Sequence, residues 1–374
     1  MPSSPPIRQQ SLPPSANNKY KKRGLTALQT TIFSAKDTDK LAAAGALLRA
    51  GGLVAIPTET VYGLACSAFR PEAVARVFAA KGRPSDNPLI VHISDLSQLS
   101  LLWDEIPPEA LRLAEAFWPG PLTMIARKRP DVPAEVTGGL DTVAVRFPAH
   151  PAAQAVINAA GVPLAAPSAN LSGSPSPTCA EHVRSDLEGR IEMILDGGEC
   201  DFGVESTVLD LTRRPFAVLR PGSVTPEMLR GVLSDVITDP AVLRPLDRGE
   251  TARSPGMKYR HYAPQSPVTA VSGPGCGSAA YIRAHLPEGG AVLCFDAFLR
   301  DFARFPSVAY GAEADAASLA RGLYASLRLL DREPHTHIFA QCPPLSEKYL
   351  AVTNRLCRSA GFRIIHVNEK GAEI

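Results

Sequence analysis

Several features that define protein classes are absent from this 374-residue sequence. No apolar run approaches the roughly 20 residues that a membrane-spanning helix needs. The seven cysteines are scattered, with no C-x-x-C pair and no metal-type spacing, so neither a disulfide framework nor a zinc site is expected. The formal net charge of +2 is too small to argue for nucleic acid or a membrane surface. These absences predict a soluble, cytoplasmic protein with reduced thiols and no side-chain metal site.

The familiar loops for nucleotides and nucleophiles are missing too. The sequence contains no G-x-x-x-x-G-K-[ST] loop, no G-x-G-x-x-G that opens a helix, no G-x-S-x-G elbow and no H-E-x-x-H. Any phosphate binding must therefore come from Lys and Arg side chains and from Ser and Asn in loops.

Acidic residues are absent from the first 23 residues, MPSSPPIRQQSLPPSANNKYKKR. This stretch is rich in Pro and Ser, and such a composition cannot bury enough apolar surface to fold. A disordered tail over residues 1–24 is predicted. A basic, Ser-containing and acid-poor segment also fits a transit peptide, but the prolines oppose the amphipathic helix that a transit peptide needs, so the tail is favoured.

What is present is the pattern of an α/β protein. Apolar residues make up 45% of the chain and charged residues 20%, as is ordinary for a globular protein. Helical periodicity over 37–52, 70–82, 107–118 and 151–161 alternates with short apolar runs typical of strands. The predicted strands are 53–57, 88–93, 121–127, 142–147, 163–170, 191–198 and 206–211. Some of these strands follow each other directly, which indicates a mixed sheet in a first domain over 25–232.

Two further regions follow the first domain. Residues 233–267 hold several prolines and the basic, aromatic string SPGMKYRHYAP without periodicity, which predicts an ordered linker. From 268 to 374 a smaller α/β pattern predicts a second domain, with helices over 317–331 and 349–361.

Polar residues recur where the predicted strands of the first domain end. The clusters are PTETVYGLAC (57–66), KGRPSDNPLIVH (81–92), LDTVAVRFP (140–148) and APSANLSGSPSPT (166–178). Singly, such residues are most often turn or helix-cap residues. Arg146 is harder to explain in that way, because a guanidinium within a strand needs an anion or several acceptors. Since open α/β sheets bind ligands at strand ends, the clusters together predict a site for a polyanion and a small polar substrate.

In this order, PTETVYGL, KGRP-S-DNPLIVHI, FWPGPLT, VAVRFPAHP, APSANLSG and ESTVLDL-LRPGSVT resemble the YrdC-domain family of L-threonylcarbamoyladenylate synthases. The linker and the second domain resemble the two-domain branch of that family. The resemblance implies a YrdC-like twisted mixed sheet with flanking helices, followed by a smaller Rossmann-like C-terminal domain.

The resemblance also implies a reaction. L-threonine, bicarbonate or CO2 and ATP would give threonylcarbamoyl-AMP and pyrophosphate, with Mg2+ sharing the charge of the phosphates. The product would pass to a downstream tRNA threonylcarbamoyl transferase machinery, and tRNA binding by this chain would be weak at most. No protein nucleophile is required, in agreement with the motifs that are missing.

Site residues are implied position by position. Arg146 would bind the threonine carboxylate, Lys81 would be a further cation on the phosphates, and the linker would be a lid that folds over the nucleotide through Tyr259. The implied threonine site is Thr60, His92, Arg146, Ala166 and Ser206. The implied ATP site is Arg83, Asn87, Thr142, Ser168, Asn170, Ser176, Arg220 and Tyr259.

Two other functions fit parts of the sequence. An RNA-binding module is suggested by the basic tail and by the linker, but the nearly balanced charge argues against strong RNA affinity. A carbamoyl-phosphate-dependent transferase is suggested by related domains in hydrogenase-maturation proteins. Those domains belong to much larger chains with zinc-finger cysteines that have no match here.

Overall fold

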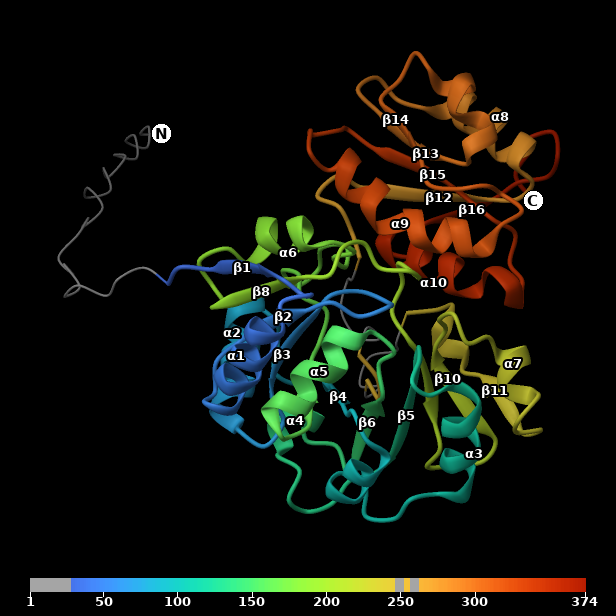
Figure 1. Cartoon of the computed structure of the whole chain (residues 1–374). Helices are drawn as coiled ribbons and strands as arrows, with labels where there is room; N and C mark the ends of the chain where they lie inside the picture. Colours follow the sequence, from blue (N-terminus) through green and yellow to red (C-terminus); the bar gives the residue numbers. More distant parts are fainter. Residues whose placement is uncertain (1–27, 246–251, 256–261) are drawn as a thin grey trace, which may run out of the picture.

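The computed structural model describes residues 28–245, 252–255 and 262–374, which form two sheets with flanking helices (Figure 1). The predicted α/β fold class is confirmed. The predicted tail over 1–24 and most of the basic string of the linker, Tyr259 included, lie outside the described residues.

The larger sheet has eleven strands and is mixed in direction, as predicted. Its strand order is β1-β8-β2-β3-β7-β4-β6-β5-β9-β10-β11. The strands are β1 (Thr31–Ser34), β2 (Val54–Ile56), β3 (Gly63–Ser67), β4 (Ile90–His92), β5 (Leu122–Arg127), β6 (Thr142–Arg146), β7 (Leu164–Ala165), β8 (Met193–Asp196), β9 (Thr207–Asp210), β10 (Phe216–Arg220) and β11 (Val236–Thr238). Because β11 pairs in parallel with β10, this sheet continues past residue 232, where the first domain was predicted to end.

Helices of this part begin and end at residues that the sequence marks. In α1 (Thr38–Arg49) the Asp37 side chain accepts hydrogen bonds from the first backbone amides, and α2 (Pro71–Lys81) starts at a proline and ends at Gly82, whose φ is 60°. The remaining helices are α3 (Pro108–Phe117), α4 (Ala134–Thr137), α5 (Pro151–Ala160), α6 (Ala180–Leu187) and α7 (Pro226–Arg230), with 3-10 turns η1 (Leu96–Leu101) and η2 (Pro240–Val242).

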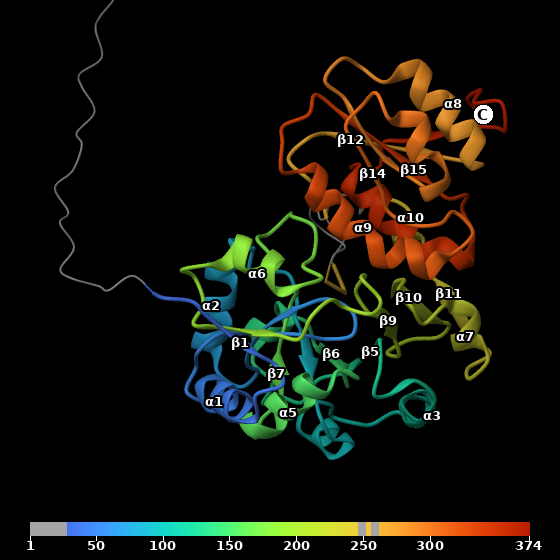
Figure 2. The same ribbon diagram turned by 45° about the horizontal axis from the view of Figure 1, so that its top comes forward.

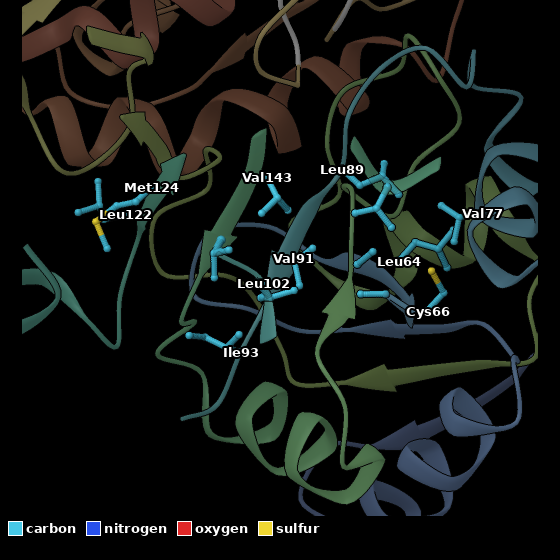
Figure 3. Close-up of a cluster of buried hydrophobic side chains, with 14 of the residues drawn as sticks. Leu64, Cys66, Val77, Leu89, Val91, Ile93, Leu102, Leu122, Met124 and Val143 are labelled. Atoms are coloured by element: carbon cyan, nitrogen blue, oxygen red, sulfur yellow. The ribbon is translucent and has the colours of Figure 1, made fainter. Parts of the chain in front are cut away.

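The main hydrophobic core lies against the central strands of the larger sheet (Figure 3). Leu64 and Cys66 on β3, Val91 on β4 and Met124 on β5 are all fully buried in it, as is Val77 of α2. This packing fixes the strands whose ends carry the polar clusters.

The smaller sheet is all-parallel, in the order β14-β13-β15-β12-β16. Its strands are β12 (Val268–Ser272), β13 (Ala291–Cys294), β14 (Ser307–Ala309), β15 (Ile338–Cys342) and β16 (Ile364–His366), and its helical segments are α8 (Gly275–His285), η3 (Asp296–Phe302), α9 (Ala316–Leu330), η4 (Glu347–Tyr349) and α10 (Leu350–Ser359). Figures 1 and 2 show α9 and α10 on the side that faces the larger sheet and α8 on the other side. Parallel strands covered by helices on both faces agree with the Rossmann-like prediction.

Within the described ranges, no helix combines the length and the apolar character that a bilayer crossing requires.

Candidate active site

A cavity opens where the polar clusters of the sequence meet. Most of the predicted site residues line it: Thr60, Arg83, His92, Arg146, Ala166, Ser168, Asn170, Ser206 and Arg220. Strand register accounts for part of this convergence. His92 on β4 and Thr123 on β5 are the two register partners of Arg146 on the strand between them, β6.

Arg146 is held by groups from three segments. Its guanidinium lies 2.6 Å from Oε1 of Glu59 in an ion pair whose side chains are each 5% exposed. Nη1 also donates to Oγ1 of Thr60 at 2.8 Å, and Nε donates to the Gly120 carbonyl oxygen at 3.3 Å. The anion that a buried strand arginine needs is thus supplied in part by the protein itself.

The Glu59 carboxylate is ionised by the same contact. Burial alone would raise the pKa of Glu59, but the charge of the adjacent Arg146 guanidinium holds that pKa below the ordinary value. One negative and one positive charge therefore face each other where Arg146 lines the cavity.

His92 is a neutral residue in this site. Burial, with a smaller contribution from the charge of Arg146, lowers the pKa of His92 to about 3. Its Nδ1 lies 3.3 Å from the Ile90 carbonyl oxygen. Near neutral pH the imidazole can offer a hydrogen bond to a substrate without adding a positive charge.

Ser206 and Arg220 form a second hydrogen-bonded unit in the cavity wall. Nη2 of Arg220 donates to Ser206 Oγ at 3.0 Å, and Nε donates to the Ser206 carbonyl oxygen at 3.0 Å. Thr123 Oγ1 lies 2.8 Å from the same Ser206 hydroxyl. The Arg220 side chain is therefore rigid, and it adds a second buried cation to the site.

Lys81 does not line the cavity. Its Nζ donates to the carbonyl oxygens of Ser168 at 2.5 Å and of Asn170 at 2.6 Å. Burial, with a smaller contribution from Arg83, holds the pKa of Lys81 well below its ordinary value. In this arrangement Lys81 fixes the loop after β7, which itself lines the cavity.

Other predicted residues also lie outside the cavity lining. Asn87 is fully buried, and neither atom of its side-chain amide has a hydrogen-bond partner within the part of the chain that the structure describes. Thr142 lies at the start of β6, at the end opposite Arg146. The Ser176 hydroxyl is bonded to Glu205, and Tyr259 is not among the described residues.

The structure also brings to the cavity residues that lie within the quoted motifs but were not among the predicted site residues. Glu205 and Tyr262 line the cavity together with Thr58 and Ser174. Glu205 directly precedes Ser206, which was predicted to bind threonine. An acidic residue beside a predicted binding residue was therefore the signal that the sequence offered. The Glu205 partners Arg355 and Tyr324 lie in the second domain, and no local pattern indicates such contacts.

A metal site made by the protein alone is not found. In the ranges that the structure describes, no three His, Cys, Asp or Glu side chains are grouped so as to hold a metal ion. Glu205, which lines the cavity, is paired with Arg355, and Glu59, which stands between the lining residues Thr58 and Thr60, is paired with Arg146.

Comparison with known proteins places both parts of the chain. Residues 46–222 match the Sua5_yciO_yrdC family, described as "Telomere recombination", and residues 224–361 match the family "Threonylcarbamoyl-AMP synthase, C-terminal domain".

Curated relatives and a solved structure agree with these matches. The threonylcarbamoyl-AMP synthase of Pyrococcus abyssi is 46% identical over 334 residues, which is 88% of this chain and 96% of the relative. That of Bacillus subtilis is 44% identical over 330 residues, 87% of this chain and 94% of the relative. A crystal structure of P. abyssi Sua5 complexed with L-threonine superposes with a TM-score of 0.80 at 44% identity, covering 91% of this chain and 99% of that one. The chain thus belongs to the threonylcarbamoyl-AMP synthase family, in its two-domain Sua5 branch.

Proposed function

We propose that the Arg146 cavity is where this chain joins L-threonine, bicarbonate or CO2, and ATP into threonylcarbamoyl-AMP and pyrophosphate. The observation that carries the proposal is the buried guanidinium of Arg146, aligned by Glu59 and Thr60 in a cavity that two further arginines line, in a chain of the synthase family. A relative solved as a complex with L-threonine supports the choice of amino acid.

Arg146 would bind the threonine carboxylate, because a planar guanidinium matches a carboxylate in two parallel hydrogen bonds. Thr60, Ser206 and the backbone at Ala166 would surround the rest of the amino acid. Neutral His92 would place no positive charge beside the threonine amine. The amine must lose a proton before it can react as a nucleophile.

The nucleotide would lie against Arg83, Ser168, Asn170 and Arg220. This part of the cavity contains two arginines and several hydroxyl and amide groups, which match the charged phosphates and the polar groups of ATP. Thr142, Ser176 and Tyr259 remain predicted nucleotide contacts, as does Asn87, whose buried amide lacks partners among the described residues. Lys81 would act on the phosphates through the 168–170 loop that it holds.

Two bonds form in the reaction, N–C and O–P, while an N–H bond of the amine and one P–O bond break. With bicarbonate a C–O bond also breaks, and the hydroxyl leaves as water with the amine proton. With CO2 a C=O π bond opens, and the amine proton passes to solvent. The threonine nitrogen attacks the carbon of bicarbonate or CO2, water leaves where bicarbonate is used, and a carbamate oxygen then attacks the α-phosphorus of ATP. The bond between the α-phosphorus and the bridging oxygen breaks, and pyrophosphate departs. The chain contributes proximity and charge stabilisation rather than a nucleophile.

Mg2+ is expected to accompany ATP and to be held by phosphate oxygens and water, because Glu59 and Glu205 are both paired with arginines. When bound, the ion would neutralise the charge that develops on the departing pyrophosphate. The product is a mixed anhydride, so a downstream tRNA threonylcarbamoyl transferase system is the partner that the reaction calls for.

The deciding experiment measures pyrophosphate release from ATP and bicarbonate while single amino acids are supplied in turn, with and without a magnesium chelator. Release that depends on threonine and Mg2+, and that is lost in Arg146→Ala, is expected. Release without amino-acid dependence, or with carbamoyl phosphate in place of bicarbonate and threonine, would favour the transferase alternative. Salt-sensitive RNA binding without ATP turnover would favour the RNA-binding alternative.

A further inference from the structure

Glu205 is a carboxylate in the wall of the cavity that contacts two side chains of the other domain. It lies just before β9 and is 6% exposed. Its Oε2 is 2.7 Å from Nε of Arg355 on α10, and Tyr324 Oη on α9 lies 3.1 Å and 3.0 Å from its two oxygens. Arg355 and Tyr324 are both fully buried.

The charge of Glu205 is maintained by this contact. Burial alone would raise the pKa of Glu205, but Arg355 first and Arg220 second hold that pKa below its ordinary value. Burial acts to lower the pKa of Arg355, but the charge of Glu205 in turn raises it. Loss of either member would leave the other as a buried, unpaired charge.

Glu205 also fixes groups that face the substrates. The Ser176 hydroxyl donates to Glu205 Oε1, and Ser206 is its neighbour in the chain. Ser206 is tied to Arg220 through both its carbonyl oxygen and its hydroxyl. One carboxylate therefore holds a predicted nucleotide residue and a predicted threonine residue in a single network.

The same network continues into the wall formed by Tyr262. The Tyr262 and Tyr324 ring centroids are 5.4 Å apart, and the Arg355 guanidinium lies over the Tyr262 ring at 5.4 Å. A side chain that lines the cavity thus packs directly on both partners of Glu205.

We propose that Arg355 and Tyr324 of the C-terminal domain are positioning residues of the substrate site, acting through Glu205 on Ser176 and Ser206. The domain has no catalytic cluster of its own, yet it supplies the counter-ion without which this wall of the cavity loses its charge balance. The inference rests on the proposed function, because the substrates named are threonine and ATP.

A purely structural role for the same contact makes a different prediction. If Arg355 only holds the two domains together, its loss lowers the fraction of folded enzyme, and the apparent kcat falls while both KM values stay as they were. If Arg355 positions the site, the KM values for threonine and ATP rise together. The Michaelis constants therefore separate the two roles.

The test compares full-length variants in the pyrophosphate assay. Arg355→Met removes the charge at similar length, and Glu205→Gln combined with Arg355→Met removes both charges of the pair. Arg230→Met is the matched control, because Arg230 on α7 pairs with Glu347 of η4 across the same two domains, but on the surface with side chains 38% and 47% exposed. Tyr324→Phe removes one hydrogen bond to Glu205 and keeps the ring, which makes it the milder variant if Arg355→Met folds poorly.

Arg355→Met is expected to raise both KM values by about tenfold, and Tyr324→Phe by about threefold. The double variant should recover most of the loss, since a neutral buried pair is tolerated better than a single unpaired charge. Arg230→Met should keep the KM values of the parent.

Three results would overturn the inference in a parent that is active. These are parental KM values in both Arg355→Met and Tyr324→Phe, an equal rise in Arg230→Met, or a double variant no better than the single one. A parent that releases no pyrophosphate with threonine would instead contradict the proposed function. Calorimetric titration of threonine and ATP onto the same variants then tests the positioning role by affinity alone.

Discussion

Glu59 and Arg146 show how a buried ion pair can both build a site and compete with its ligand. The pair neutralises two charges that would each be costly to bury alone. A threonine carboxylate arriving at Arg146 would be a second anion on one guanidinium, sharing it with Glu59. The strength of substrate binding therefore depends on how much of the guanidinium Glu59 already satisfies.

Glu59→Gln separates these two roles. The variant leaves Arg146 buried without an anion, and we expect the free energy of unfolding to fall by about 3–5 kcal/mol in the absence of ligand. Threonine would then supply the missing anion, so the rise in Tm caused by threonine should be larger in the variant than in the parent. Thermal unfolding with and without threonine measures both effects.

The matched control is Glu72→Gln, which breaks an ion pair with Arg70 whose side chains are 46% and 65% exposed. Its stability and its response to threonine should stay close to those of the parent. An equal threonine effect in Glu59→Gln and in the parent would argue against Arg146 as the carboxylate site.

His92 gives stability a pH dependence. The pKa of His92 in the folded protein is about 3, below the ordinary 6.5. Between these two pH values the unfolded chain binds a proton at His92 and the folded chain does not. The contribution of neutral His92 to stability is therefore complete above pH 6.5 and is lost as pH falls from there towards 3.

His92→Gln should remove this effect. Over the acid range the free energy of unfolding of the parent should fall more steeply than that of the variant, by a difference that approaches about 1.4 kcal/mol per pH unit. Urea unfolding curves at a series of pH values provide the slopes. Parallel slopes for the two proteins would mean that His92 is not held neutral.

The segment from Asp201 to Glu205 belongs to the first domain and contacts helix α9 of the second domain. The Phe202 amide donates to the Glu59 carbonyl oxygen at 2.9 Å, and Arg321 on α9 donates to the Asp201 carbonyl oxygen at 2.9 Å. At Gly203, where φ is +72°, an added Cβ would lie 2.5 Å from Cα of Arg321. The backbone of α9 therefore packs directly against a glycine in a left-handed conformation. This close approach requires a residue without a Cβ at position 203.

Gly203→Ala is expected to destabilise the fold by about 2–4 kcal/mol, from left-handed strain together with overpacking against α9. Gly161→Ala is the control, since Gly161 has a similar φ of +68° with open space around it. That variant should lose about 1 kcal/mol from backbone strain alone. Chemical unfolding of the two variants compares them, and equal losses would show that α9 does not press on Gly203.

The sequence predicted the longer elements well and several short ones poorly. Helices such as α5 and α9 carry apolar stripes with clear stop signals, which depend on local residues alone. In contrast, β3, β11 and β1 have no sequence pattern that separates them from the loops around them. They are strands because neighbouring strands of the sheet supply hydrogen bonds. For β1 and β3 these include partners far along the chain, β8 and β7.

At the scale of the whole molecule, the reactivity of each cysteine thiol depends on its burial. All seven cysteines are free, Cys276 is exposed, Cys179 is partly buried and the others are buried. Burial raises the pKa of Cys66 and of Cys357 to about 12, so these thiols are poor nucleophiles near neutral pH.

A thiol reagent added to the native protein should therefore modify one residue rapidly, Cys276, and all seven after denaturation. Cys276→Ser should abolish the rapid phase and leave the total lower by one. A reductant should leave the Tm unchanged, because no disulfide is present to break. Rapid reaction of several native thiols would contradict the burial that the two domains create.

What the sequence determined by itself was local or carried by ordered motifs. It determined the α/β class, the mixed first sheet, the longer helices and the strand-end residues that converge on the cavity, because periodicity, caps and a polar side chain at a strand end are properties of neighbouring residues. A buried charge on Arg146 was also predictable, since a strand arginine requires compensation. Its partner could not be named, because a carboxylate of the protein and one of a ligand satisfy it equally well.

The tertiary structure decided which charges meet. It paired Arg146 with Glu59, turned Lys81 towards backbone carbonyl oxygens, and placed Arg355 of the second domain on Glu205 of the first. These contacts join residues far apart in sequence. Their geometry depends on how sheets and domains pack, and packing, unlike periodicity, leaves no signal in the residues beside each charge.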